Sequence, residues 1–246
     1  MENTLLRAIQ KELVELLGKT NSLGVHDIGC GIGRTVRNLA SSFDCRVTGI
    51  DLIPTTYISL AEKPSHMVGL SKETSFYKET SGLDIPFSNE EYEVVWMEHV
   101  QINIPSKGKF ATELARVLRQ DGMVVFHKIF SDSGDDPHFP VPWADGPSGN
   151  FLVSKENFQN ALKEAGLEVI QWKDVTEPSL QWFDDVTQRL ADSGPPQLGL
   201  HLLMGETAQT KLGNVGKTYG RIEFVLRSLS VVSGDWIKQQ NFFLGQ

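Results

Sequence analysis

A short apolar strand that runs into three alternating glycines constrains this chain most. Residues 25–28 are typical of a buried strand, and Gly29, Gly31 and Gly33 follow at every second position. Glycine accepts positive φ angles and has no Cβ, so a ligand can lie directly against the backbone. The amphipathic helix expected after the turn begins with N–H groups that have no partner within the helix. A strand, a glycine-rich turn and a helix in this order are typical of nucleotide-binding sites.

Two acids flank the glycine run. A dinucleotide fingerprint needs its third glycine where Arg34 stands, so the match to that motif is incomplete. Asp27 precedes the glycines, and Asp51 ends a second predicted strand, residues 46–51. A carboxylate at the end of that strand can accept hydrogen bonds from both hydroxyls of a ribose. The sequence therefore favours a nucleotide-like ligand over the alternative, a tight strand–helix turn that binds nothing.

Taken together, Asp27–Gly33 and Gly49–Leu52 resemble the class I S-adenosylmethionine-dependent methyltransferases. The resemblance covers residues 25–129. Four further stretches are similar to the enzymes of ubiquinone and menaquinone C-methylation: Asp84–Phe87, Tyr92–Trp96, Glu113–Leu118 and Asp121–Gly122. The loop Pro137–Ala144 is more similar to the glycine, sarcosine and dimethylglycine N-methyltransferases. The resemblance implies a Rossmann-like α/β fold, with a doubly wound, mostly parallel, seven-stranded sheet and helical lid insertions.

The apolar periodicity alternates between strands and helices, which indicates a parallel, doubly wound sheet in one domain over residues 1–246. Helices are expected over residues 4–18, 55–63 (ended by Pro64), 106–119, 155–165, from Pro178 to a break at 193–196, and over roughly 197–211. Further strands are expected over residues 76–78, 92–97, 123–129 (after a turn at 121–122), 167–172 and 221–231. The proline-rich loop 131–150 and the segment 176–218 are expected to be lid insertions on the substrate side.

Composition indicates an ordinary globular protein of 246 residues, 40% of them hydrophobic and 22% charged. The net charge of −8 disfavours a nucleic-acid partner, because such proteins usually present a basic face. Cys30 and Cys45 are expected to be free thiols in a reducing compartment, which predicts a cytoplasmic protein. No apolar run approaches the ~20 residues of a membrane span, and the N-terminus lacks the pattern of a signal peptide, so no membrane partner is expected.

The resemblance implies S-adenosyl-L-methionine as the cofactor, with a position for each of its parts. Its methionine part would be surrounded by the acid and glycines of the loop, and its ribose would be held by the acid of the second strand. The residues in question are Asp27, Gly29, Gly31, Gly33 and Asp51.

The same resemblance assigns the rest of the cofactor site. Leu52 would lie against the adenine, and Met97 would face the sulfonium. Ser81 stands where relatives have an acid that contacts the adenine amino group. Ser81, the backbone at Gly82, or Asp84 would therefore supply that contact.

Candidate residues for the methyl acceptor follow two buried strands, at the sheet edge where open α/β folds bind ligands. We expect Glu98 near the cofactor and His99 orienting or deprotonating the acceptor, the alternative for His99 being a cap on the next turn. Asn103 would hydrogen-bond the acceptor or lie in a surface turn. His127 is either a polar residue of the cleft or a core histidine.

The loop 131–150 carries His138, Phe139 and Trp143. These rings would either cover an amine ligand or anchor the loop as an apolar plug. The three acids of the loop are expected to face solvent, and no histidine or cysteine spacing indicates a metal site, so no metal is expected.

These features predict a methyltransferase that uses S-adenosylmethionine on a small molecule, more often an amine nitrogen than a carbon or oxygen. Two alternatives are C-methylation of a quinone-like ring and a non-catalytic, cofactor-binding subunit. Only about two dozen residues precede the first strand, fewer than in the small-amine relatives. We therefore expect a more open site or one completed by a partner. The apolar stretch 198–204 would suit a homodimer surface.

Overall fold

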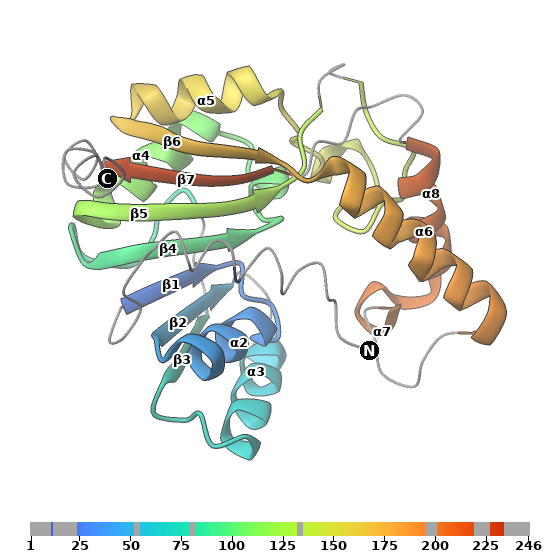
Figure 1. Ribbon diagram of the computed structural model, residues 1–246, viewed down its shortest axis with the longest axis horizontal. Helices are drawn as coiled ribbons and strands as arrows, with labels where there is room; N and C mark the ends of the chain where they lie inside the picture. Colours follow the sequence, from blue (N-terminus) through green and yellow to red (C-terminus); the bar gives the residue numbers. More distant parts are fainter. Residues whose placement is uncertain are drawn as a thin grey trace, which may run out of the picture.

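Seven strands form one sheet in the order β3-β2-β1-β4-β5-β7-β6 (Figure 1). The computed structural model describes residues 11, 24–51, 55–78, 82–131, 135–194, 201–218 and 227–233. The strands are β1 (Gly24–Ile28), β2 (Arg46–Asp51), β3 (Thr74–Lys78), β4 (Tyr92–Glu98), β5 (Leu118–Lys128), β6 (Leu167–Asp174) and β7 (Arg227–Ser233). All neighbouring strands pair in parallel except β7, which is antiparallel to β5 and β6. The expected doubly wound, mostly parallel sheet is confirmed.

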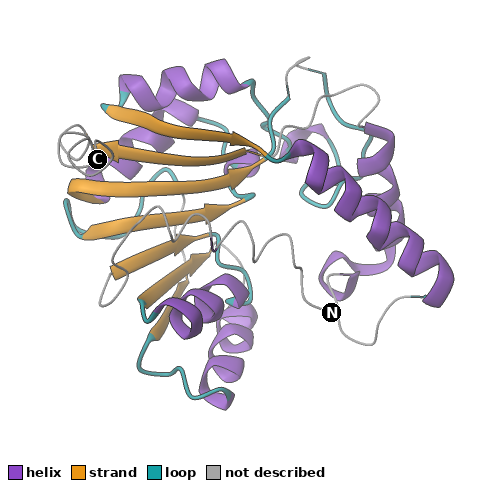
Figure 2. Cartoon of the chain, in the orientation of Figure 1, coloured by secondary structure: helices purple, strands orange, loops and turns teal. Residues whose placement is uncertain are grey.

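Helices cover both faces of the sheet (Figure 2). They are α2 (Arg34–Phe43), α3 (Thr55–Met67), α4 (Lys107–Val117), α5 (Lys155–Glu164), α6 (Thr176–Ser193), α7 (His201–Met204) and α8 (Ala208–Thr218), with 3₁₀ turns η1 (Gln101–Asn103), η2 (Pro147–Gly149) and η3 (Gly205–Thr207). Side chains of β4 alternate between two buried clusters. Val94 and Trp96 pack with residues of α2, whereas Val95 and Met97 pack with residues of α4 and α5. This alternation follows from the two-residue period of a strand.

The carboxyl ends of the parallel strands meet at one edge of the sheet, and helices α6–α8 lie beyond that edge (Figure 1). Chain order along the sheet reverses between β1 and β4, which are neighbours although β2 and β3 separate them in the sequence. Ligands of open α/β sheets bind at such a reversal, outside the carboxyl ends of the strands. The fold therefore points to the segments that follow β1, β2 and β4.

Helix α3 continues through Pro64 to Met67, so the expectation that Pro64 ends the helix is wrong. Proline removes one helical N–H donor and is costly inside a helix. Here the Ser65 hydroxyl donates to the carbonyl of Ala61 (3.1 Å), and the N–H of Val68 donates to the carbonyl of Pro64 (3.1 Å). Backbone bonding thus resumes beyond the proline.

Residues 121–122 lie inside β5 and not in a turn before it, which corrects a second expectation. Between the pairs Tyr92–Leu118 and Val94–Met123, β4 advances by two residues (92 to 94) and β5 by five (118 to 123). The extra residues make a bulge. A Cβ on Gly122 would lie 2.9 Å from the backbone oxygen of Arg119, so the bulge leaves no room for a side chain.

Other boundaries differ less. The helix expected over roughly 197–211 is two helices, α7 and α8, separated at Gly205, whose φ is 72°. Helix α8 also runs through Gly213. Pro178 lies in the first turn of α6, where its missing N–H has no helical partner to lose. The expected helix 4–18 lies outside the described residues apart from residue 11, and the last strand is described from Arg227 rather than 221.

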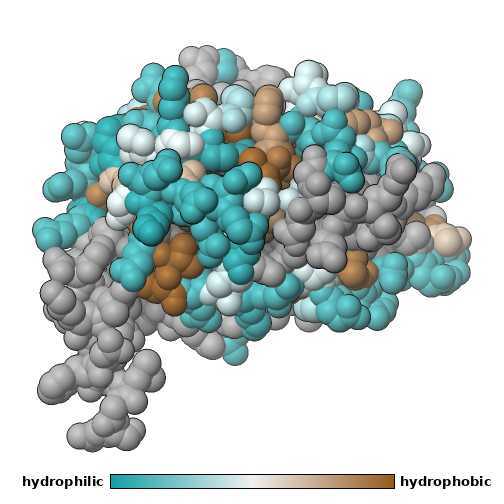
Figure 3. All heavy atoms as spheres, turned by 90° about the horizontal axis from the view of Figure 1, so that it is seen from above, coloured by the Kyte–Doolittle hydropathy of each residue, from teal (hydrophilic) through white to brown (hydrophobic). Residues whose placement is uncertain are grey.

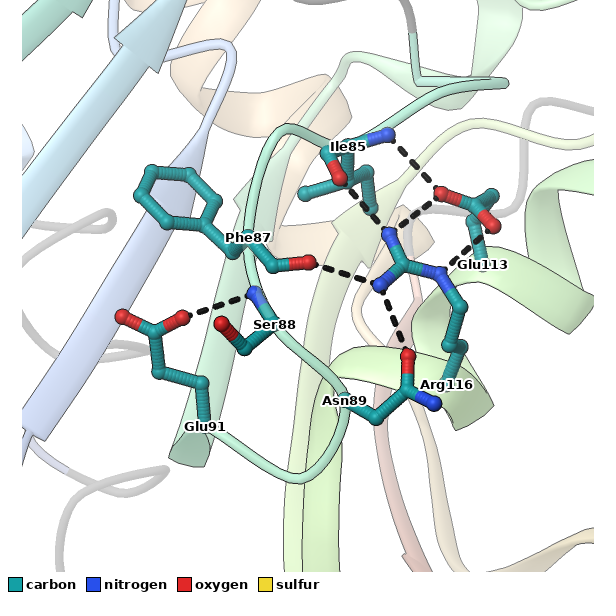
Figure 4. A network of polar contacts seen from close by, with 7 residues as sticks. All are labelled: Ile85, Phe87, Ser88, Asn89, Glu91, Glu113 and Arg116. Carbon is teal, nitrogen blue, oxygen red and sulfur yellow. Dashed lines mark hydrogen bonds and ion pairs between the residues drawn. The ribbon is translucent and has the colours of Figure 1, made fainter.

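A polar network anchors the segment that leads into β4 (Figure 4). The Arg116 guanidinium of α4 donates to the carbonyls of Ile85 (2.6 Å) and Phe87 (2.7 Å) and forms a salt bridge with Glu113 (2.8 Å). Glu113 also accepts from the N–H of Ile85 (2.8 Å). The planar, multi-donor guanidinium suits this role because it can bind several oxygens at once. The network holds residues 85–89 against α4.

The face drawn in Figure 3 is mostly hydrophilic, with its apolar residues in small separate groups. Within the described ranges, no helix combines the length and apolar character that crossing a bilayer requires.

Lys128 places an amine in the core of the described structure. Its side chain is 1% exposed, and its Nζ has no hydrogen-bond partner among the described residues. The amine lies 2.9 Å from the ring centroid of Phe158 and 4.0 Å from that of Phe130. Burial, and then the nearby Lys107, hold the pKa of Lys128 well below its ordinary value. Folding near neutral pH therefore has to desolvate or deprotonate this amine.

Replacing Lys128 by Met should stabilise the protein, because a thioether needs neither hydration nor a hydrogen-bond partner. The lysine pKa is lower in the folded chain than its unfolded value of about 10.4, so folding releases a proton between these two values. Stability of the parent chain should therefore rise with pH through that window. Lys128→Met should remove this slope and gain at least about 1 kcal/mol at pH 7, measured by denaturant unfolding at pH 6, 7 and 9.

Lys163→Met is the matched control, because Lys163 is exposed on α5. Its effect should stay within about 0.5 kcal/mol at every pH. A loss of stability in Lys128→Met that does not vary with pH would contradict our account of the buried amine.

Candidate functional site

The glycine loop between β1 and α2 has one open position between two closed ones. Gly29, Gly31 and Gly33 have φ angles of 80°, 52° and 72°, in the left-handed region that favours glycine. A Cβ on Gly29 would overlap Val100, and one on Gly33 would lie 2.5 Å from the Phe76 ring. A Cβ on Gly31 would meet nothing within 4 Å. The loop is therefore packed on its flanks and open at its centre.

Hydrogen bonds tie this loop to the end of β2. The N–H groups of Gly29 and Cys30 donate to the carbonyl of Ile50 (2.7 and 3.0 Å). The N–H of Gly31 donates to the Asp51 carboxylate (2.6 Å). The two acids expected to bind the cofactor therefore stand on adjacent strands, with the open glycine beside Asp51.

The carboxyl groups of Asp27 and Glu98 lie at the same edge of the sheet as that of Asp51. Asp27 is 2% exposed, and its Oδ2 has no hydrogen-bond partner among the described residues. Burial, followed by the neighbouring carboxylates of Glu98 and Asp51, raises the pKa of Asp27 well above its ordinary value. Glu98 accepts from the Thr35 hydroxyl (2.9 Å) and from the Trp96 indole N–H (3.0 Å). An acid-rich site of this kind suits a positively charged ligand.

Thr35 and Trp96 were not expected to belong to the site. They orient Glu98 from the first turn of α2 and from β4, two elements that only the folded sheet brings together. The N-cap of helix α2 is Gly33, which has no side chain that could accept from the first N–H groups of the helix. A hydroxyl residue in that first turn, Thr35, was the local signal by which the sequence could have indicated a polar contact there.

His99 follows β4 with a backbone conformation that is costly for a residue other than glycine. Its φ is 58°, and its N–H donates to the carbonyl of His127 (2.8 Å). Such strain concentrates at functional sites. The two imidazole rings lie 4.6 Å apart between centroids. The structure thus brings together two residues that were predicted to face the acceptor from different strands.

The two histidines differ in exposure. His99 is exposed, whereas His127 is 5% exposed and neither of its ring nitrogens has a hydrogen-bond partner among the described residues. Burial, and then the nearby His99, hold the pKa of His127 well below its ordinary value. Desolvation also lowers the pKa of His99, and we expect this effect to be smaller because the exposed ring keeps part of its hydration. Both rings are neutral at pH 7.

The proline-rich loop lies against the segment after β4. The Asn103 amide donates to the carbonyls of Trp143 (2.8 Å) and Gly149 (3.0 Å). Trp143 is partly buried against the cluster that contains Trp96. His138 is exposed on the same loop. Asn103 and Trp143, predicted separately, are therefore direct neighbours.

Remaining predicted residues fall into two groups. Leu52 and Ser81 lie outside the described residues. Met97 is 2% exposed in the cluster under α4, and Gly82 is buried, with Ile104 2.6 Å from where its Cβ would stand. Both residues are packed in the core, and the contacts with the cofactor expected of them stay predictions.

Residues 26–126 match the family model described as "Methyltransferase domain". One relative is a 2-methyl-6-phytyl-1,4-hydroquinone methyltransferase from Synechocystis, 28% identical over 176 residues, which are 67% of this chain and 53% of that protein. Another is a chloroplastic tocopherol O-methyltransferase from Arabidopsis thaliana, 35% identical over 101 residues, 41% of this chain and 28% of that protein. The chain therefore spans about half, or less, of the length of these relatives.

Solved structures agree on the fold. A putative sarcosine dimethylglycine methyltransferase from Galdieria sulphuraria aligns with a TM-score of 0.77 at 17% identity, covering 93% of this chain and 85% of that one. A geranyl diphosphate C-methyltransferase from Streptomyces coelicolor, solved with S-adenosyl-L-homocysteine, aligns with a TM-score of 0.72 at 16% identity, covering 94% and 81%. Residues 26–126 are thus similar to a methyltransferase domain, and the glycine loop and sheet order give the chain the Rossmann-like fold of the class I S-adenosylmethionine-dependent methyltransferases.

Proposed function

We propose that this chain transfers a methyl group from S-adenosylmethionine to a hydroxyl oxygen or ring carbon of a small molecule. The observation that carries the proposal is the open glycine, Gly31, bonded to Asp51, whose carboxylate lies near those of Asp27 and Glu98. The cofactor has a cationic ammonium and a cationic sulfonium, and it has a ribose with two hydroxyls. Its charges and donors suit the carboxylates, and its chain can lie over Gly31, where no side chain intrudes.

Individual roles follow from the geometry. Asp51 would accept from the ribose hydroxyls, and the buried Asp27 would face the ammonium group. Glu98, held by Thr35 and Trp96, would contribute negative charge near the sulfonium. When bound, the cofactor supplies a methyl group that is already activated, so the chain mainly has to hold the acceptor in line.

His99 is our candidate for the residue that orients and deprotonates the acceptor. Its neutral, exposed ring can accept a proton from a phenol or hydroquinone hydroxyl. The acceptor class rests on the relatives by sequence, whose names specify a hydroquinone and a tocopherol O-methyltransferase. Acceptor sites differ widely on one fold, so the class of acceptor has to be determined by experiment.

An amine nitrogen is the second candidate acceptor. It is expected from the rings of His138, Phe139 and Trp143 on the loop 135–151, which we call the aromatic loop. The sarcosine dimethylglycine enzyme that supports it is similar in fold at 17% identity. Binding of the cofactor without any turnover would instead support a non-catalytic subunit.

Incubation with labelled S-adenosylmethionine and two acceptor panels tests the proposal. One panel contains hydroquinones and phenols, and the other contains sarcosine, dimethylglycine and related amines. We expect S-adenosylhomocysteine to form with the first panel. Turnover confined to amines would move the function to the second candidate. Calorimetry that detects no binding of either cofactor form would overturn both.

Asp51→Asn should weaken cofactor binding by roughly ten- to a hundredfold, because a carboxylate that accepts from hydroxyls is replaced by an amide. Isothermal titration with S-adenosylhomocysteine measures this loss. Asp44→Asn is the control, since Asp44 is an exposed acid at the end of α2 with a φ of 52°, a conformation that asparagine tolerates. An unchanged affinity in Asp51→Asn would remove Asp51 from the site.

His99→Asn should lower kcat about a hundredfold and leave cofactor affinity unchanged. Asparagine tolerates the left-handed backbone at this position, so the fold is kept while the base is removed. In the parent chain, kcat should fall at low pH as His99 becomes protonated, below its ordinary pKa of 6.5 because that pKa is lowered. This acidic limb should vanish in the variant.

His66→Asn serves as the control, because His66 is exposed at the end of α3. If His99→Asn keeps both its rate and its acidic limb, another group handles the proton.

A further inference from the structure

The Asn103 side chain is committed to the backbone of the aromatic loop. Its Nδ2 carries two hydrogens and donates to two carbonyls, those of Trp143 (2.8 Å) and Gly149 (3.0 Å). Both acceptors lie more than 35 residues along the chain. The N–H of Phe151 also donates to the carbonyl of Ile102, next to Asn103 (2.8 Å). The turn η1 therefore holds the middle and the C-terminal end of the loop 135–151.

The loop has bonds of its own that keep its shape. The Trp143 indole donates to the side chain of Asn150 (3.1 Å), which in turn donates to Asp136 (3.0 Å). Val141 and Ala144 exchange backbone hydrogen bonds (2.8 and 3.1 Å). Because these hydrogen bonds lie within the loop, we expect it to keep its shape when its attachment to η1 is broken.

Helix α8 rests on this loop. The Asn214 amide donates to the carbonyl of Pro140 (3.0 Å), and Lys211 forms a salt bridge with Asp145 (2.8 Å). Figure 1 shows α6 and α8 side by side beyond the carboxyl edge of the sheet. The loop thus links η1 to helix α8. The last residue of η1, Asn103, follows His99 by four residues.

We propose that Asn103 is a positioning residue, whose amide holds the aromatic loop and the helices on it over the acceptor side of His99. The acceptor side is given by the proposed function, on which this inference rests, whereas the attachment of the loop rests on the two hydrogen bonds of Asn103. It assigns Asn103 a different part from direct contact with the acceptor, since both amide hydrogens already have partners. Trp143, held by its carbonyl, is then fixed against the buried cluster beside β4.

Asn103→Asp tests this attachment. The change keeps the size of the side chain but replaces the donating nitrogen by an oxygen, which repels the two carbonyls. We expect the amide hydrogens of Val141, Ala144 and Phe151 to exchange about tenfold to a hundredfold faster, from the loss of two ordinary hydrogen bonds. Exchange in β4 should stay unchanged, which shows that the core remains folded.

Kinetics give a second readout. The KM for the acceptor should rise, while the dissociation constant for S-adenosylhomocysteine stays within about twofold, since the cofactor loop is held by its hydrogen bonds to β2. Asn103→Gln retains the amide donor on a longer arm and should recover part of both effects. Asn157→Asp, the same chemical change at an exposed position of α5, should alter neither the exchange of the loop nor the KM.

Outcomes of the two readouts are separable. A higher KM with unchanged exchange of the loop would overturn the proposal in favour of direct contact with the acceptor. Unchanged exchange and unchanged kinetics would also overturn it. If the parent chain turns over no acceptor, the proposed function fails, and exchange at Phe151 still decides whether Asn103 holds the loop.

Discussion

The hydrogen bond from the Gly31 N–H to the Asp51 carboxylate is the contact on which the rest of the site depends. It joins the turn after β1 to the end of β2, and the N–H groups of Gly29 and Cys30 complete the attachment at Ile50. Only glycine fits at positions 29 and 33 of this path, because Val100 and Phe76 fill the space that a Cβ would need there. The path then sets where α2 begins and hence where Thr35 meets Glu98.

Electrostatics divide the carboxyl edge of the sheet into two parts. The acids lie near the ends of β1, β2 and β4, with Asp27 buried beside Glu98 and Asp51. The β4–β5 side presents neutral histidines with lowered pKa values. A cationic cofactor and a proton-donating acceptor would each find the environment that suits them. Such a division lets one fold keep its cofactor chemistry while the acceptor changes.

Attachment differs between these two parts as well. The glycine loop is bonded to the sheet itself, which is rigid. The aromatic loop is bonded to the 3₁₀ turn η1 through Asn103 and Ile102, and α8 is in turn bonded to that loop. Loops that carry acceptor specificity are commonly mounted in this way on a rigid scaffold.

Local pattern alone was enough for β1, the glycine turn, α2 and β2, because apolar periodicity and glycine chemistry act over a few residues. It also predicted a mostly parallel sheet, from the alternation of strands and helices. It misjudged Pro64, whose helix is sustained by Ser65, and residues 121–122, which pairing with β4 draws into a bulge. The proximity of His99 to His127, the support of Glu98 by Thr35 and the bonds of Asn103 to a loop forty residues away were decided only by the tertiary structure. Each of these contacts joins segments that are distant in the chain, and no local propensity carries information on which of them will meet.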